Sequence, residues 1–185
     1  MTQAGTAKGI LLALIANFIW GIAALYWIQT KPIGPVDVMA HRALWTLPVT
    51  FFIVLFFGRL SETIALMRSL KFCFWIALAA LMLTINWGVY VFAVTNERAT
   101  EASLGYFMLP LLTIALGVFM FGERPKPVHI LAILLAIIAV LVQLFAYGSL
   151  PWVSLTLAMS FALYGAIRKQ ISADSMQGLF LESLC

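Results

Sequence analysis

Charge is scarce in this chain. Only 10% of its 185 residues are Asp, Glu, Lys or Arg, whereas 64% are hydrophobic and the mean hydropathy is +1.06. A soluble domain is usually about a quarter charged and less than half apolar. So few charges cannot cover a surface that faces water, which excludes an ordinary soluble domain.

Cysteines, clustered cations and catalytic groupings are scarce as well. Cys73 and Cys185 are too few for a disulfide framework. The eleven Lys and Arg are scattered between apolar runs instead of forming a nucleic-acid-binding patch. His41 and His129 are expected near opposite faces of a membrane, too far apart to share a metal. The sequence has no paired carboxylates, nucleophile elbow or Cys/His cluster, so we predict no enzyme activity, no metal and no cofactor.

Long apolar runs dominate the chain instead. The run after Glu101 has about twenty residues, contains Pro110 in its middle and stops at Gly122. Twenty helical residues span roughly 30 Å, the thickness of the hydrocarbon core of a bilayer. Six such helices are predicted, at about 9–28, 36–57, 72–94, 102–121, 128–147 and 151–167, and a seventh run begins near Gly178. The predicted fold class is therefore an all-α polytopic membrane bundle.

The first run is not interpreted as a signal peptide. The apolar region of a signal peptide has about 7–15 residues and is followed by a cleavage site of small residues. This run is longer and ends in Tyr26-Trp27 ahead of Lys31-Pro32, which is typical of an interfacial anchor followed by a loop. We therefore predict that it is retained. The longest polar stretch, 58–71, is too short to form a soluble domain.

The loops on alternate sides of the predicted helices differ in positive charge. One side has eight cations and the other has only Lys31, Arg42 and Arg98. The eight are Lys8, Arg59, Arg68, Lys71, Arg124, Lys126, Arg168 and Lys169. Because positive loops remain in the cytoplasm, the N-terminus is predicted to lie inside. The same imbalance argues against insertion in both orientations.

A weak internal repeat spans 144 positions. Phe18-Ile19-Trp20-Gly21-Ile22 aligns with Ala162-Leu163-Tyr164-Gly165-Ala166. Five predicted helices separate the starts of these two segments, so a repeat of five helices would be inverted in the membrane. Inverted repeats are a common plan of secondary transporters, which place the substrate site near the midplane.

Several short segments resemble a known family. Residues 101–107 (EASLGYF), Pro110 and residues 122–124 (GER) resemble the fourth helix of EamA-type transporters of the drug/metabolite transporter superfamily. Residues 18–23 (FIWGIA), 41–42 (HR), 86–87 (NW), 148–151 (GSLP) and 164–169 (YGAIRK) resemble the RarD branch more specifically. The resemblance covers nearly the whole chain.

The resemblance implies ten helices in two inverted five-helix halves, in the bacterial inner (plasma) membrane, with both termini cytoplasmic. Residues 1–147 would form the first half and residues 148–185 the start of the second. The chain is therefore interpreted as a fragment or a truncated product. The intact protein is expected to carry a small organic metabolite or drug across the lipid bilayer by alternating access.

Polar and aromatic residues inside the predicted helices are candidates for a substrate cavity, because buried polar groups must be paired or face water. The candidates are Asn17, Trp20, Asn86, Tyr90, Ser103, Tyr106 and Tyr164. Their amide, hydroxyl and aromatic groups would suit an amphipathic metabolite. The alternative is that Asn and Ser only form hydrogen bonds between helices.

Four further residues are assigned gating or structural roles. Arg42 can extend to the outer interface as an anchor, or it can attract substrate or gate. Glu101 is expected to cap the fourth predicted helix, with proton coupling as the alternative. Pro110 is expected to kink that helix, and Glu123 to fix the following loop. A membrane protein that binds or regulates a partner without transporting anything is the alternative function.

Overall fold

A computed structural model describes residues 3–30, 32–122, 124, 126–147 and 150–185 of the chain. These residues form eight helices and no strands. The helices are α1 (Gln3–Gln29), α2 (Pro35–Phe56), α3 (Leu60–Leu66), α4 (Leu70–Thr95), α5 (Ala99–Phe121), α6 (Pro127–Tyr147), α7 (Trp152–Arg168) and α8 (Ser175–Ser183). Four of them, α1, α2, α4 and α5, are long and apolar enough to cross a membrane, and α6 and α7 contain shorter apolar stretches. The predicted all-α bundle is thus confirmed.

Local sequence signals set the helix ends. Pro35 is the first residue of α2. The N–H that proline lacks would have no acceptor within the helix at this position, so no helical hydrogen bond is lost. The Ser69 side chain accepts a hydrogen bond from the Phe72 N–H at the start of α4. Gly58 and Gly122 follow α2 and α5 with φ of 67° and 64°, a conformation that glycine adopts without strain.

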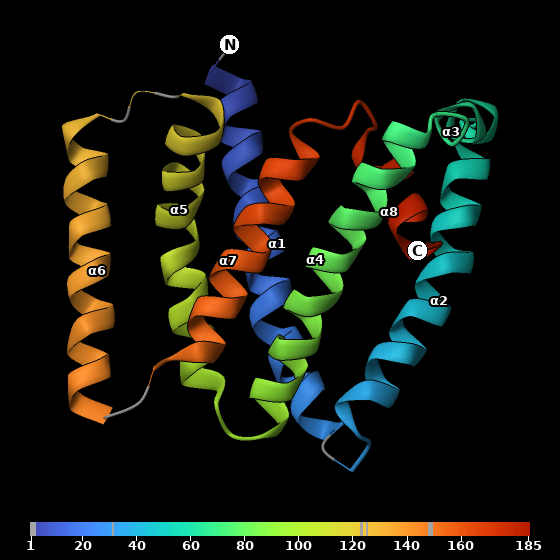
Figure 1. Cartoon of the computed structure of the whole chain (residues 1–185). Coiled ribbons are helices and arrows are strands. Elements are labelled where there is room, and N and C mark those ends of the chain that lie inside the picture. Colours follow the sequence, from blue (N-terminus) through green and yellow to red (C-terminus); the bar gives the residue numbers. More distant parts are fainter. Residues whose placement is uncertain (1–2, 31, 123, 125, 148–149) are drawn as a thin grey trace.

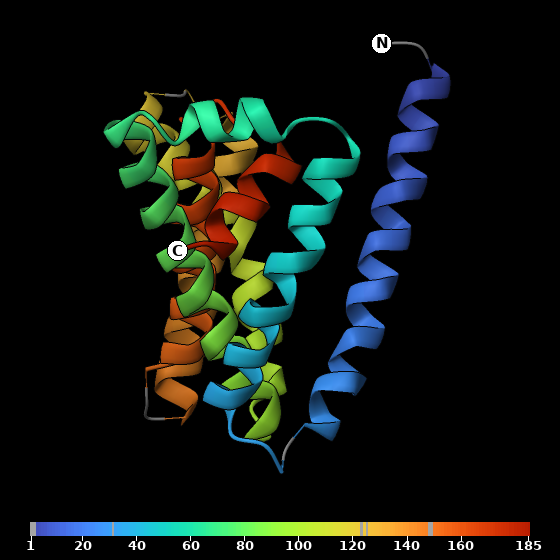
Figure 2. The same ribbon diagram turned by 90° about the vertical axis from the view of Figure 1, so that its right-hand side faces the viewer.

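Two features of the helix pattern differ from the prediction. The polar stretch 58–71 contains α3, a single short helix that lies across the end of the bundle (Figure 2). The last helix starts at Ser175 instead of Gly178, because Asp174 and Gln177 form a reciprocal capping box. The Asp174 carboxylate accepts from the Gln177 N–H at 2.9 Å. This pairing orders one more turn than hydropathy alone indicated.

The core of the bundle is formed by α4, α5 and α7, with α2 and α8 on one flank and α6 on the other (Figure 1). A methyl group at Gly105 of α5 would lie only 2.8 Å from the Ser154 carbonyl oxygen of α7, so these two helices approach at glycine. The Ser154 hydroxyl donates to the Glu101 carbonyl at 2.7 Å. Small residues and polar cross-bonds of this kind hold helices together in lipid, where burial of apolar surface gives little net gain.

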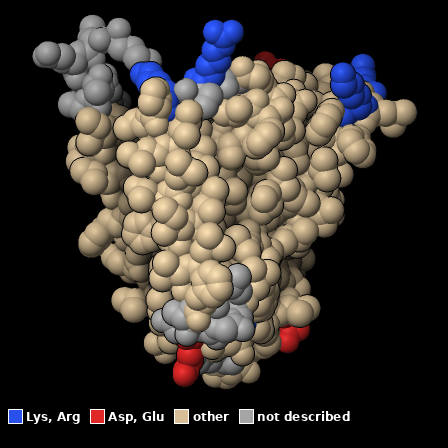
Figure 3. Space-filling model, turned by 60° about the vertical axis from the view of Figure 1, so that its left-hand side comes forward, with Lys and Arg blue, Asp and Glu red and all other residues tan. Residues whose placement is uncertain are grey.

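The two ends of the bundle differ in charge. We call the end where α1 begins the upper end, as in Figure 1, and the opposite end the lower end. On the face seen in Figure 3, Lys and Arg side chains gather at the upper end, where a little acidic surface is also visible behind them, acidic side chains appear at the lower end, and the band between carries neither. This distribution matches a bundle whose middle lies in hydrocarbon.

The helices that carry the internal repeat run in opposite directions. Helix α1 descends from the upper end, and α7 climbs back to it (Figure 1). Trp20 lies in α1 and Tyr164 in α7. Figure 2 shows α1 beside the rest of the bundle, nearest to it at the lower end. Most described α1 side chains are exposed, and Trp27 is one of the exceptions.

Candidate functional site

An aromatic cluster joins α1, α2 and α4 around Trp87. The ring centroid of Trp87 lies 5.1 Å from that of Trp20, 5.8 Å from that of Trp27 and 5.8 Å from that of Tyr90. The Arg42 guanidinium carbon stands 3.6 Å from the centre of the Trp87 ring. Edge and tilted ring contacts are the favourable geometries for aromatic pairs, and a cation above an indole face is attracted by its quadrupole. We call these five residues the Trp87 cluster.

Asn86, the neighbour of Trp87, is fully buried and ties α4 to α7. Its Nδ2 donates to the Leu157 carbonyl at 2.9 Å and to the Ser160 hydroxyl at 3.1 Å. Its Oδ1 accepts from the Tyr106 hydroxyl at 3.4 Å. The amide therefore has partners on both sides, as a buried polar group in a membrane protein requires. Asn86 therefore links α4 to α7 and to Tyr106 of α5.

Tyr106 extends the cluster to α5. Its ring centroid lies 6.0 Å from that of Tyr90, with the two rings close to edge-on. Tyr90 is buried, whereas Tyr106 is 37% exposed. The two tyrosines thus link the Trp87 cluster to α5.

A cavity of about 640 Å³ opens between α1, α2 and α8. Its described lining is Tyr26, Trp27, Thr30, Ile33, Val38, His41, Arg42, Trp45, Thr46, Val49, Thr50, Ile53 and Leu179. Trp27 and Arg42 belong both to this lining and to the Trp87 cluster. The cavity and the cluster therefore form one continuous site with aromatic walls and a positive charge. Its volume falls within the roughly 300–1,000 Å³ of small-molecule pockets.

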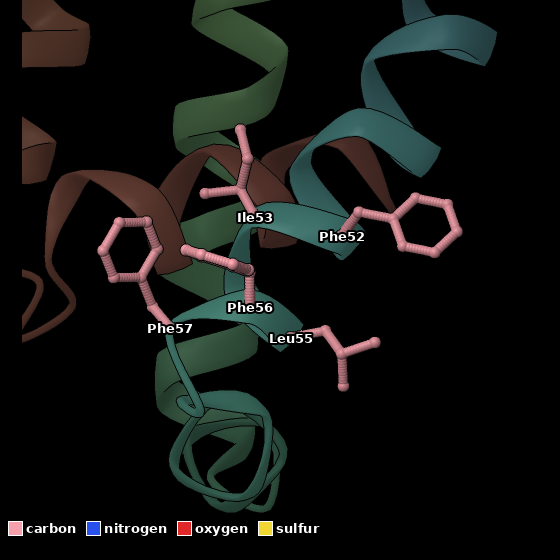
Figure 4. A pocket seen from close by; sticks show the side chains of 5 residues that line it. All are labelled: Phe52, Ile53, Leu55, Phe56 and Phe57. Carbon is pink, nitrogen blue, oxygen red and sulfur yellow. The ribbon is translucent and has the colours of Figure 1, made fainter.

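A second hollow, of about 430 Å³, lies at the upper end of α2 and has a different character (Figure 4). It is lined by Phe52, Ile53, Leu55, Phe56 and Phe57. Figure 4 shows these side chains spreading from the last turns of α2 and the residue that follows it, with Phe52 and Leu55 on one side and Phe57 on the other. All five are apolar, so nothing there would orient a ligand.

A separate polar cluster lies between α7 and α8. The Glu182 side chain is 3% exposed, and its Oε2 accepts from the Tyr164 hydroxyl at 3.2 Å. Arg168 Nε lies 3.6 Å from Glu182 Oε1, and Arg168 Nη2 donates to the Asp174 carbonyl at 3.2 Å. Arg59 pairs with the Asp174 carboxylate and so connects the cluster to α3. Sequence reasoning named Tyr164 but missed Glu182, although a lone acid in an apolar run is a usable signal.

The remaining predicted residues lie outside both clusters. Asn17 is exposed on α1, and its Nδ2 donates to the Ala13 carbonyl of its own helix at 2.8 Å. Ser103 is exposed on α5. Pro110 is exposed within α5, which is helical on both sides of it. Glu123 lies outside the described residues.

Glu101 differs from the expected arrangement, and Arg42 contacts an aromatic ring. Glu101 accepts from Arg98 Nε at 2.6 Å and from Nη2 at 3.0 Å, so its carboxylate forms an ion pair in the first turn of α5 instead of a cap. A negative charge there is still favoured by the helix dipole. Arg42 is half-buried, and its guanidinium lies on the face of Trp87. Among the described residues, no group of three or more His, Cys, Asp or Glu could hold a metal.

Long apolar helices with polar clusters buried between them define a polytopic helical membrane protein. Residues 7–145 match the EamA-like transporter family, and the chain therefore belongs to this family. It is similar to RarD proteins, with 41% identity to the protein of Streptomyces exfoliatus and 40% to that of Escherichia coli. It is also 37% identical to the uncharacterized transporter YojE of Bacillus subtilis. No solved structure matches the chain.

The chain is shorter than these relatives. The alignments cover 95%, 97% and 99% of the chain but only 56%, 60% and 62% of the Streptomyces, Escherichia and Bacillus proteins. The chain therefore spans less than two thirds of the length of these relatives.

Proposed function

We propose that the protein containing this chain is a secondary transporter of small organic solutes that works by alternating access between two inverted halves. Residues 1–147 would form the first five-helix half and residues 148–185 the start of the second. The observation that carries the proposal is the continuous site formed by the Trp87 cluster and the cavity beside it. The family match and the opposite directions of α1 and α7 support it.

The candidate residues receive different roles in this proposal. Trp20, Tyr90 and Tyr106 would contribute aromatic surface to the substrate path, and Asn86 would hold α4 against α7. Tyr164 would act with Glu182 in the second half. Asn17 and Ser103 remain proposed path residues that would contact substrate only in another conformation. Pro110 would allow α5 to bend during the transport cycle, and Glu101 would anchor the start of α5.

Transport is tested on the product of the native gene. Its intact mass is measured first, because 20.5 kDa corresponds to the 185-residue chain and a larger mass to a longer protein. That product is reconstituted in liposomes, and the flux of aromatic carboxylates, amines, amides and amino acids is followed. We expect saturable flux of at least one class over protein-free liposomes. If a folded, monodisperse product moves none of them, the partner-binding alternative replaces the transport proposal.

We also propose that the upper end of the bundle faces the cytoplasm of a bacterial inner membrane. Its support is the excess of Lys and Arg at that end. With Cys73 and Cys185 replaced by alanine, single cysteines are introduced as Thr100→Cys at the lower end and Arg68→Cys at the upper end, both at exposed positions. An impermeant maleimide should label Thr100→Cys in intact spheroplasts and Arg68→Cys only after lysis. The reverse pattern would invert the assignment.

A further inference from the structure

In the part of the chain that the structure describes, three arginines of the bundle pair with acids, whereas Arg42 does not. Arg59 pairs with Glu62 and Asp174, Arg98 pairs with Glu101, and Arg168 pairs with Glu182. Across the described ranges, Arg42 has no carboxylate within ion-pair distance, and none of its N–H groups donates to a described residue. Among the described residues its guanidinium lies on the face of Trp87 and interacts electrostatically with the Tyr106 phenol, neither of which carries a charge that would balance it. A guanidinium partly removed from water in this way retains a strong preference for an anion.

The described lining of the cavity around Arg42 holds no acid to balance this charge. None of the thirteen described lining residues is Asp or Glu. The hydroxyls of Thr30, Thr46 and Thr50 already donate to carbonyls of their own segments, at 2.7, 2.7 and 2.8 Å. The indole Nε1 of Trp27 is buried with no hydrogen-bond partner among the described residues. The protons of these threonine hydroxyls are thus already used, so the charged donor that remains for a ligand in the described lining is the Arg42 guanidinium, which calls for an anionic acceptor.

The position of Arg42 suits a flat anionic group. Because Trp87 covers one face of the guanidinium, the N–H groups at its edges remain for a ligand, and two of them match the two oxygens of a carboxylate. Tyr26, Trp27 and Trp45 provide aromatic surface in the same cavity. A ligand with a carboxylate at one end and an aromatic body at the other would use both features.

We propose that this cavity is a binding subsite for an aromatic organic carboxylate, with the carboxylate on Arg42 and the ring against Tyr26, Trp27 and Trp45. This inference rests on the proposed transport function, because it names the substrate class of the same site. The local charge makes a cationic solute the least suitable ligand.

The test measures binding to the purified protein in phosphatidylcholine nanodiscs by equilibrium dialysis. The probes are 3-phenylpropionate, its neutral amide and the cation 3-phenylpropylamine, which share one ring and chain. We expect the carboxylate to bind at least about tenfold more tightly than the amide, with the amine weakest. Similar affinities for all three probes, tighter binding of the amine, or no binding of the carboxylate at millimolar concentration would overturn the proposal. This comparison needs no variant.

Variants locate the effect. Arg42→Gln should lower carboxylate affinity about tenfold or more and leave amide affinity unchanged, whereas Arg42→Lys should keep part of the preference. Arg68→Gln is the matched control, because it removes an exposed cation far from the cavity. Equal losses for the carboxylate and the amide in a monodisperse, helical Arg42→Gln protein would contradict a role in charge recognition.

Two further arms separate this inference from its alternatives. Nanodiscs that contain phosphatidylglycerol should leave 3-phenylpropionate binding unchanged. Loss of the probe there, restored in phosphatidylcholine, would assign Arg42 to a lipid headgroup and overturn the substrate assignment. Flux of only neutral or cationic solutes in liposomes would preserve the transport function and overturn the carboxylate subsite. Carboxylate binding without any flux would preserve the carboxylate subsite and overturn the transport function.

Discussion

Replacing Arg168 by methionine is expected to lower the free energy of unfolding by about 3 kcal/mol, the lower part of the range measured when one partner of a buried ion pair is removed. The Glu182 side chain is 3% exposed and that of Arg168 is 16% exposed. Methionine keeps much of the apolar stem but leaves the carboxylate without its cation. The Tyr164 hydroxyl would then be the remaining donor to Glu182 among the described side chains. The measurement is reversible unfolding in mixed micelles, followed by far-ultraviolet circular dichroism.

The loss should be coupled to Glu182. In the double variant Arg168→Met/Glu182→Gln, both charges are gone, and the amide oxygen of Gln can still accept from the Tyr164 hydroxyl. We therefore expect the double variant to recover more than half of the stability lost by Arg168→Met. If the double variant loses as much stability as the sum of the losses in the Arg168→Met and Glu182→Gln single variants, the two residues do not form an ion pair.

Arg59→Met is the matched control for this prediction. Arg59 also pairs with acids, but its side chain is 41% exposed and that of Glu62 is 61% exposed. Solvent screens such pairs, so the change should stay within about 1 kcal/mol. If Arg59→Met destabilises the protein as much as Arg168→Met does, burial does not set the strength of these pairs.

The membrane-spanning helices could be predicted from the sequence because in lipid the backbone N–H and C=O groups must form their hydrogen bonds within each helix. Length and hydropathy then suffice: the predicted helices match α2, α4, α5, α6 and α7 to within about three residues at each end, whereas α1 begins at Gln3, ahead of the predicted start near residue 9. Shorter elements depend on other forces. Helix α3 has seven residues and packs at the end of the bundle, and the start of α8 depends on the Asp174 capping box.

The site was only partly predictable for a related reason. A polar residue in an apolar run can be recognised as a candidate site residue from the sequence, as Asn86 and Arg42 were. The residue that it contacts depends on how the helices cross. Trp87 follows Arg42 by 45 positions, and Leu157 follows Asn86 by 71. Asn17 carries the same kind of signal as Asn86, yet its amide donates to its own helix. Only the packing of α4 against α7 separates the two cases.

Trp87→Ala is expected to impair the candidate site more than any other single change in the cluster. The indole contacts Trp20, Trp27 and Tyr90 and lies under Arg42, so its removal takes support from three helices at once. Truncating a packed tryptophan typically lowers the free energy of unfolding by about 3–5 kcal/mol, and because Trp87 is half-buried we expect about 2–3. Phe119→Ala, at a position 85% exposed on α5, should change it by less than about 0.5 kcal/mol.

Substitutions that keep volume separate packing from the cation contact. Trp87→Phe retains an aromatic face and should keep most of the stability and of the 3-phenylpropionate affinity. Trp87→Leu fills space without a ring quadrupole, so it should recover stability better than it recovers affinity. Since a cation over an indole is worth about 0.5–2 kcal/mol, the Leu variant should bind the carboxylate roughly 2–30-fold more weakly. Equal affinity in the Phe and Leu variants would mean that Trp87 positions Arg42 by shape alone, without the cation contact.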